Sequence, residues 1–387
     1  MPPGVTDPEE LAAWLRLLET PQVGRLAARR LLAAFGSPQA VLEASVAARR
    51  AVVGQAAAAA LAVAPVGICA LVQSTVDWLA CVQGSPRSVL TLADANYPAL
   101  LLESADPPLL LYALGRIDLL QSPSVAVVGS RDATPQGKDN ARAFANQISQ
   151  AGLTIVSGLA LGIDGAAHEG AMEGRGSTIA VVGTGLDRVY PRRHHDLARR
   201  IAESGLLISE YALGTPPLAH HFPQRNRIIS GLARATLVVE ATLQSGSLIT
   251  ARLALESGRD VYAVPGSIHA PQSRGCHSLI KQGAKLVESA QDVLEEFDLP
   301  VMILRPTDSA GTASATAVNP TEAASNPQTK EVQRVLDAMG YDPVGLDALI
   351  DRTGCSAPEL NVRLLDLELN GQVARLPGQL FQRLGRG

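Results

Sequence analysis

Aromatic side chains are scarce in this 387-residue chain, at 3% of its residues, and only four of its 33 basic residues are lysines. The four cysteines lie far apart without a C-x-x-C pair, which argues against a disulfide framework and a zinc site; they are Cys69, Cys81, Cys276 and Cys355. The longest apolar run, residues 56–72, is mostly alanine and is interrupted by Pro65, so it is too weakly hydrophobic to span a bilayer. The acidic N-terminus carries no secretory signal. We therefore expect a cytoplasmic protein with no membrane association and no metal.

Neither sign of charge dominates, because 37 acidic residues face 33 basic ones and the net charge is −4. No segment forms a basic tail, which argues against indiscriminate nucleic-acid binding but leaves room for a local cationic site. Hydrophobic residues make up 47% of the chain, which is enough to build a sizeable core and excludes wholesale disorder.

The periodicity of hydrophobic residues divides the chain into four segments: 1–84, 85–300, 301–328 and 329–387. In the first, Leu11, Trp14, Leu15 and Leu18 repeat at helical spacing. The turn at residues 20–24 resembles that of a helix-hairpin-helix, whose backbone N–H groups can contact DNA phosphate. A purely structural helical domain explains this segment equally well.

Residues 85–300 alternate short β-branched runs with amphipathic helices, the pattern of a parallel sheet covered on both faces. The predicted fold class is α/β, with an extended Rossmann-like, doubly wound parallel sheet whose ligands bind at the carboxyl ends of the strands. Runs at residues 88–92 and 109–114 are expected to extend the sheet on its N-terminal side. The remaining strand candidates are Val125–Val128, Leu153–Val156, Thr178–Val182, Leu206–Ser209, Thr236–Val239, Asp260–Val264 and Lys285–Val287.

The last two segments differ sharply in composition. Residues 301–328 are rich in Ser, Thr, Ala and Pro without periodicity and predict a flexible linker. Residues 329–387 contain three short helical patterns followed by a hairpin pattern, the outline of a winged helix. Its candidate recognition helix, residues 357–369, has three acidic residues against Arg363 alone, so a protein-contacting role is favoured over DNA reading.

The turn after the first parallel strand contains Gly129, Ser130 and Arg131, which suit an anion at the start of the next helix. A dinucleotide fingerprint is missing here, and so is a Walker A loop, since Asp139 follows Gly137-Lys138 where Ser or Thr is required. We therefore expect no nucleotide cofactor.

Two further turns combine glycines with polar residues. In the turn at residues 157–168, Gly158 is a candidate DNA contact, and Asp164 and His168 share a helix face, where a structural hydrogen bond is favoured over a metal or acid–base pair. In the turn at residues 183–193, Arg192 is a candidate phosphate contact, although exposed arginines are commonly only solvated.

The segment 220–231 supplies an aromatic ring next to cations. Phe222 can stack on a base while Arg225 and Arg227 hold phosphates, and Asn226 lies between them. Either arginine can instead pair internally with Glu210 or Glu240. Further along, a helix start rich in hydroxyl groups forms another anion site; its residues are Ser245, Gly246 and Ser247.

These motifs together resemble the DNA-processing protein A family (DprA/Smf). GSR, SGLAxGIDGxAH, GTGLDxxYP, FPxRNRIISGL, VVEAxxxSGSLITA and AVPG occur in the family's order and spacing, from Leu90 to about Phe297. The resemblance implies a protein that binds single-stranded DNA and loads the RecA recombinase onto incoming DNA in natural transformation and recombination. It implies no enzymatic activity. The family's DNA-contacting positions fall on Arg131, Arg192, Phe222, Arg225 and Asn226.

The resemblance also implies a homodimer formed through the Rossmann-like domain, with its contact near the last helix of the sheet. Leu279 and Ile280 are neighbours on that helix, so one of them is a candidate interface residue unless a wide buried stripe takes both. One departure concerns Gln136, which stands where the family usually has an aromatic residue.

Two other functions would use parts of the same sequence. A nucleotide-processing hydrolase could use the same anion-binding turns, with Glu240 or Glu210 as its carboxylate, but no catalytic motif accompanies them. A transcription regulator is disfavoured by the acidic recognition helix.

Overall fold

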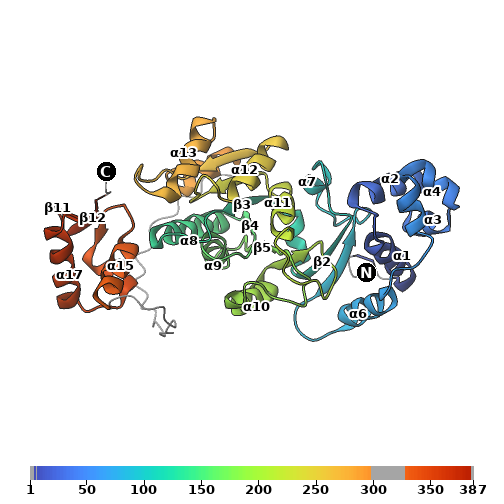
Figure 1. Ribbon diagram of the computed structural model, residues 1–387, viewed down its shortest axis with the longest axis horizontal. Coiled ribbons are helices and arrows are strands. Elements are labelled where there is room, and N and C mark those ends of the chain that lie inside the picture. Colours follow the sequence, from blue (N-terminus) through green and yellow to red (C-terminus); the bar gives the residue numbers. More distant parts are fainter. Residues whose placement is uncertain (1–3, 6, 298–326, 385–387) are drawn as a thin grey trace.

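The computed structural model describes residues 4, 5, 7–297 and 327–384. A helical region, a central α/β region and a winged helix follow one another along the longest axis of the molecule (Figure 1). Among the helices in the part of the chain that the structure describes, none combines the length and hydrophobicity needed to cross a membrane.

The helical region packs onto the central sheet. Asp7, Ser37 and Ser45 each accept a hydrogen bond from the first turn of the helix that follows, which fixes where these helices begin. Leu11, Trp14 and other apolar residues of the region share one core with strands β1 and β2. Its helices are α1 (Pro8–Glu19), α2 (Arg25–Phe35), α3 (Pro38–Glu43), α4 (Val46–Val53), α5 (Gln55–Ala60) and α6 (Ile68–Ala80).

The central sheet has nine strands in the order β1-β2-β6-β5-β4-β3-β7-β8-β9. From β6 to β9 all neighbours are parallel, whereas β1 and β2 pair antiparallel with each other and β2 pairs antiparallel with β6. The strands are β1 (Arg87–Thr91), β2 (Leu110–Gly115), β3 (Ser124–Val128), β4 (Thr154–Ser157), β5 (Thr178–Val181), β6 (Leu206–Ser209), β7 (Ala235–Val238), β8 (Asp260–Ala263) and β9 (Lys285–Leu286).

The predicted parallel sheet is therefore confirmed for its central strands, and its N-terminal extension is antiparallel. β1 and β2 follow each other in the chain and pair directly. A parallel pair would require a crossover, usually a helix that covers the sheet, and between these strands the chain forms only the four-residue α7 (Ala99–Leu102). The nine strands of this sheet lie within two residues of their predicted bounds.

Helices cover both faces of the sheet (Figure 1). On one face, apolar residues of α11 (His221–Leu232), α12 (Ser247–Glu256) and α13 (Arg274–Lys281) pack on the strands. On the other, α8 (Pro135–Gln150) turns its stripe of Ala141, Phe144, Ala145 and Ile148 to β3 and β4 beside α9 (Ile163–Ala171). The other elements are α7 (Ala99–Leu102), η1 (Ile117–Gln121), η2 (Arg192–His194), α10 (His195–Ser204), η3 (Pro271–Ser273), α14 (Ala290–Leu294) and η4 (Glu295–Phe297).

The predicted interface residues Leu279 and Ile280 both take part in this packing. Leu279 is 6% exposed within the core, and Ile280 is partly buried against it. Leu279 is therefore taken up by the core, whereas Ile280 keeps part of its surface exposed, and the prediction that one of them faces a partner stays a prediction.

The C-terminal region has its own core, formed by Leu349, Leu360, Leu364, Phe381 and their neighbours. The predicted linker, residues 301–328, falls outside the described residues except for Pro327 and Gln328, which begin α15. The elements are α15 (Pro327–Met339), β10 (Val344–Gly345), α16 (Leu346–Thr353), α17 (Ala357–Leu369), β11 (Val373–Leu376) and β12 (Leu380–Arg383).

Candidate nucleic-acid interface

A cavity of about 460 Å³ opens at the carboxyl edge of the sheet, where the strand order reverses between β3 and β7. Doubly wound sheets bind their ligands at this point because the loops on either side diverge. Nine of the twelve predicted DNA-binding residues line it: Gly129, Ser130, Arg131, Phe222, Arg225, Asn226, Ser245, Gly246 and Ser247. Gly158, Arg192 and Arg227 do not.

Arg131 lies over an aromatic pair at the cavity. Its guanidinium carbon is 5.7 Å from the centroid of the Phe222 ring, which lies 5.4 Å from the ring of Tyr190. Arg131 is exposed and makes no ion pair within the described residues. An exposed cation beside two rings is an arrangement that can hold a phosphate while a base stacks.

Tyr190 was missed in the sequence analysis, although it is 48% exposed and completes this aromatic pair. It occurs in the turn that was considered only for its arginines. The signal was present in the sequence, since Tyr190 precedes Pro191 at the end of a glycine-containing loop.

In the turn after β3, the backbone of Gly129 lies close to the side chain of Ile163. A Cβ atom at Gly129 would lie 2.5 Å from Cγ1 of Ile163, so a side chain does not fit there. The backbone N–H of Ser130 donates to the carbonyl of Glu240 at 2.7 Å and is therefore already used. Any anion bound here would be held by side chains rather than by this amide.

Arg225 is not a free phosphate contact in this structure. Its side chain is buried and donates to the Gly158 carbonyl at 2.6 Å, and it lies 3.9 Å from the Asp164 carboxylate. Burial lowers the pKa of Arg225 to about 10, and nearby Asp164 opposes that change. The guanidinium thus holds the loop after β4 in place, and the role of Arg225 in holding phosphate stays a prediction.

The same contact explains Gly158. A Cβ atom there would lie 1.4 Å from Nη1 of Arg225, so this position requires glycine for internal packing. The predicted DNA contact at Gly158 is therefore replaced by an internal one.

Arg227 faces away from the cavity and forms an internal ion-pair network. It pairs with Glu210 and places Nε 3.0 Å from Oδ2 of Asp106. The alternative of pairing with Glu210, left open by the sequence, is the arrangement that the structure shows. Arg227 is thus structural, and its predicted phosphate contact is contradicted.

Asp106 also forms ion pairs with two arginines of the helical region, Arg25 and Arg29. Nε of Arg25 lies 2.9 Å from one of its oxygens, and Nη2 of Arg29 lies 2.8 Å from the other. The start of α2, where a helix-hairpin-helix would contact phosphate, therefore faces a carboxylate of the central region.

Three other predicted residues form part of the cavity wall: Asn226, Ser245 and Ser247. Asn226 donates to the carbonyl of Gly246 at 3.3 Å, and the hydroxyls of Ser245 and Ser247 are 2.7 Å apart at the start of α12. Arg192 is exposed on η2, outside the cavity. Its role as a phosphate contact stays a prediction.

Asp164 and His168 do not form the predicted hydrogen bond. Asp164 accepts from the backbone N–H groups of Gly158 and Ala160, and burial raises its pKa while Arg225 opposes the rise. His168 instead contacts the hydroxyl of Thr178 at 2.7 Å. Asp164 and His168 share a helix face, but the carboxylate of Asp164 is hydrogen-bonded to the loop that precedes α9 and not to His168.

The two carboxylates considered for a hydrolase are also engaged in the structure. Glu240 accepts from the backbone N–H and the hydroxyl of Thr134, at 2.9 and 2.6 Å, and so fixes the start of α8. Burial raises the pKa of Glu240, and the hydrogen bonds from Thr134 oppose the rise. Glu210 pairs with Arg227. Neither carboxylate lines the cavity.

Three family models match consecutive parts of the chain. The model of the DNA recombination-mediator protein A matches residues 88–298, that of the DprA-like N-terminal HHH domain matches residues 8–65, and that of the DprA winged helix domain matches residues 319–379. The helix-hairpin-helix and the winged helix expected from the sequence are thereby confirmed.

Characterised relatives agree with these matches. Protein Smf of Escherichia coli is 42% identical over 79% of this chain and 79% of the relative, and the DNA processing protein DprA of Streptococcus pneumoniae is 51% identical over 54% of this chain and 73% of the relative. The X-ray structure of that pneumococcal protein superposes with a TM-score of 0.64 at 39% identity, covering 76% of this chain and 98% of the other.

A second solved structure, of DNA processing protein A from Helicobacter pylori, is described by its single-stranded DNA binding mode. It superposes with a TM-score of 0.50 at 32% identity and covers 55% of this chain and 95% of the other. The expectation of a non-enzymatic DNA-binding recombination mediator is thus confirmed over that of a nucleotide hydrolase. The chain belongs to the DNA recombination-mediator protein A family.

Proposed function

We propose that this protein binds single-stranded DNA at the carboxyl edge of its central sheet and delivers RecA recombinase to that DNA in natural transformation. One observation supports the site above all others: the 460 Å³ cavity unites exposed Arg131, the ring of Phe222 and the start of α12 at the switch point of the sheet. Tyr190 extends the aromatic surface. Sequence-independent single-strand binding uses this combination of cations and stacking rings.

Salt-dependent binding to an oligothymidylate tests the site. Arg131→Gln should weaken binding and reduce the slope of log K against log salt by about 0.7, the value for one phosphate contact to a single strand. Arg116→Gln is the matched control, because Arg116 is exposed, pairs only with Asp118 among the described residues and lies outside the cavity. An Arg131 variant that keeps the wild-type slope would remove the assignment.

The protein is proposed to act as a homodimer through the β8–β9 edge of the sheet. Leu279 is buried and Ile280 is partly buried, but Ile268 in the loop after β8 is 74% exposed and Leu286 in β9 is 43% exposed. Edge strands with exposed apolar residues are surfaces on which a second chain can pair. Light scattering of Ile268→Glu should report monomers; dimers with wild-type stability would place the interface elsewhere.

RecA delivery and cytoplasmic action are proposed from family membership. A pull-down of RecA with the full chain, in the presence and absence of single-stranded DNA, tests the first. Loss of RecA filament nucleation in Arg131→Gln with retained RecA binding would separate DNA binding from recombinase contact.

A further inference from the structure

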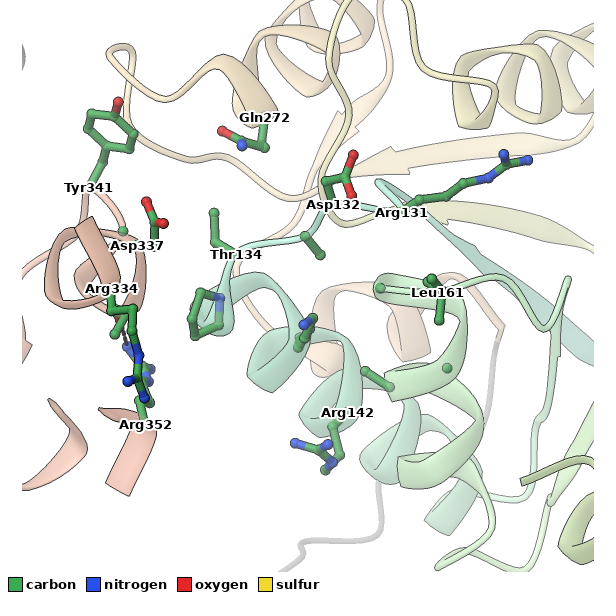
Figure 2. A pocket seen from close by; sticks show the side chains of 18 of the residues that line it. Arg131, Asp132, Thr134, Arg142, Leu161, Gln272, Arg334, Asp337, Tyr341 and Arg352 are labelled. Atoms are coloured by element: carbon green, nitrogen blue, oxygen red, sulfur yellow. Dashed lines mark hydrogen bonds between the residues drawn. The ribbon is translucent and has the colours of Figure 1, made fainter. Parts of the chain in front are cut away.

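A second and larger cavity, of about 870 Å³, lies between the central region and the winged helix. One wall consists of the turn after β3, α8 and the start of α9, and the other consists of α15, α16 and β12 (Figure 2). We refer to this space as the interdomain cleft. Arg131, Asp132 and Gln272 line both the cleft and the smaller cavity, so the two adjoin at these residues.

The cleft is basic although the winged helix as a whole is not. Seven of its lining residues are Arg or Lys and three are Asp or Glu, among the residues that the structure describes. The acidic recognition helix α17 contributes none of the lining residues and lies on the far side of the winged helix from α8 (Figure 1). The charge of α17 therefore does not decide what the cleft binds.

The cations of the cleft fall into two groups. Three are paired with carboxylates: Arg142 with Glu169 at 2.6 Å, Arg352 with Asp139 at 2.9 Å, and Arg383 with Asp337 at 4.0 Å. The other four are exposed and form no ion pair within the described ranges: Arg131, Lys138, Arg193 and Arg334. A ligand in the cleft would therefore meet unneutralised positive charge from both walls.

Arg352 holds the two walls together. Its Nη2 donates to Oδ2 of Asp139 at 2.9 Å and to Oε1 of Gln136 at 3.1 Å, both on α8. Gln136 is the residue that replaces the aromatic ring expected from the family resemblance. In this chain it contacts the winged helix instead of offering a stacking surface.

We propose that the interdomain cleft is a second binding site for the phosphates of single-stranded DNA, in which Arg334 on α15 extends the path that begins at Arg131. Arg131 and Arg334 lie at opposite ends of the cleft (Figure 2). A strand that leaves the smaller cavity past Asp132 reaches the cleft next, since the two adjoin at Arg131, Asp132 and Gln272. The winged helix thus binds DNA through α15 and α16 and not through its recognition helix. This inference rests on the proposed single-strand binding at Arg131.

Full-chain variants and two DNA lengths test this proposal. Arg334→Gln should weaken binding of an oligothymidylate of about 20 nucleotides two- to fivefold, the size expected for one exposed charge pair, and reduce its salt slope by about 0.7. Binding of an oligonucleotide of about six nucleotides, long enough for the smaller cavity alone, should be unchanged. Asp337→Asn, which removes an exposed negative charge from the same helix and cleft, should have the opposite effect on the long strand.

Arg375→Gln is the matched control, because Arg375 is exposed on β11 of the winged helix but does not line the cleft. Equal weakening by Arg334→Gln and Arg375→Gln would show a non-specific charge effect and overturn the proposal. Wild-type or tighter binding by Arg334→Gln would overturn it as well, the latter by showing that the winged helix obstructs the strand.

The same series separates this inference from the proposed function. If Arg131→Gln weakens both lengths and Arg334→Gln weakens neither, single-strand binding at the sheet edge stands and the extension fails. If Arg131→Gln changes neither length, the proposed function itself fails. Arg352→Gln provides a second variant: by releasing the winged helix from α8, it should impair only the long strand.

Discussion

The guanidinium of Arg225 occupies the space in which a side chain at Gly158 would lie, because a Cβ atom there would be 1.4 Å from Nη1. The same arginine donates to the Gly158 carbonyl at 2.6 Å. Arg225 is only 4% exposed, and moving it to make room would break this hydrogen bond and its 3.9 Å contact with Asp164. The loop after β4 precedes α9, which lies beside the proposed DNA site. The conformation of this loop thus depends on the buried guanidinium of Arg225 and on the absence of a side chain at Gly158.

Gly158→Ala should lower the free energy of unfolding by about 3 kcal/mol, the upper part of the range for overpacking a rigid site. Urea unfolding with an unchanged m-value measures this. Gly246→Ala is the control, since no atom lies within 4 Å of a Cβ there and its φ of −61° suits alanine. Its stability should stay within about 0.5 kcal/mol of wild type. Equal stability of both variants would contradict the packing argument.

Tyr190→Ala should weaken single-strand binding by about 1–3 kcal/mol, the usual contribution of one stacked base. Because Tyr190 is 48% exposed, the thermal midpoint should change little. Tyr190→Phe keeps the ring beside Phe222 and should bind like wild type. Weak binding by both variants would indicate a role for the hydroxyl group and not for stacking.

The sequence predicted the sheet well because each strand is a short apolar run ended by a glycine or a polar turn. It also predicted a site at the carboxyl ends of the strands, but only the strand order of the structure shows that the turns after β3 and β7 lie next to each other there. The antiparallel direction of β1 and β2 was not predictable, because an apolar run has the same composition in either direction.

The roles of individual arginines could be predicted only in part. Arg131, Arg225 and Arg227 look alike in sequence, yet one is exposed and two are internal. The partner Asp106 is more than 100 residues away from Arg227, so only the folded chain identifies it. Such distant pairing decides whether a cation can bind phosphate.

Arg227→Gln should therefore change the stability of the protein, whereas Arg131→Gln should change its DNA binding. Loss of Arg227 removes the more buried of the two arginines that contact both Glu210 and Asp106, leaving Arg25, and should cost about 2 kcal/mol of stability. The salt slope of DNA binding should not change. Loss of Arg131 should reduce that slope by about 0.7 and leave stability nearly intact. Paired measurements of unfolding and binding on both variants check this dissociation.

His168 should make the protein less stable as the pH falls. Its ring is fully buried, and burial first, then the nearby charges of His194 and Arg225, lowers its pKa to about 3. The Thr178 hydroxyl donates to the carbonyl of Ile155, so it accepts the hydrogen of His168 Nδ1. Nε2 is buried without a partner among the described residues, and a proton there would be unsatisfied.

The sign follows from proton linkage. Between about pH 6.5 and pH 3 the unfolded chain binds a proton at His168 that the folded chain does not, so stability is full above pH 6.5 and is lost as pH falls. The loss from this residue should approach about 1.4 kcal/mol per pH unit in that window. Urea unfolding at several pH values, compared with His168→Gln, isolates the contribution, because glutamine takes up no proton. Should that variant fail to fold, the imidazole NMR signal of His168 in the wild type decides: a transition near pH 6.5 would contradict the buried neutral ring.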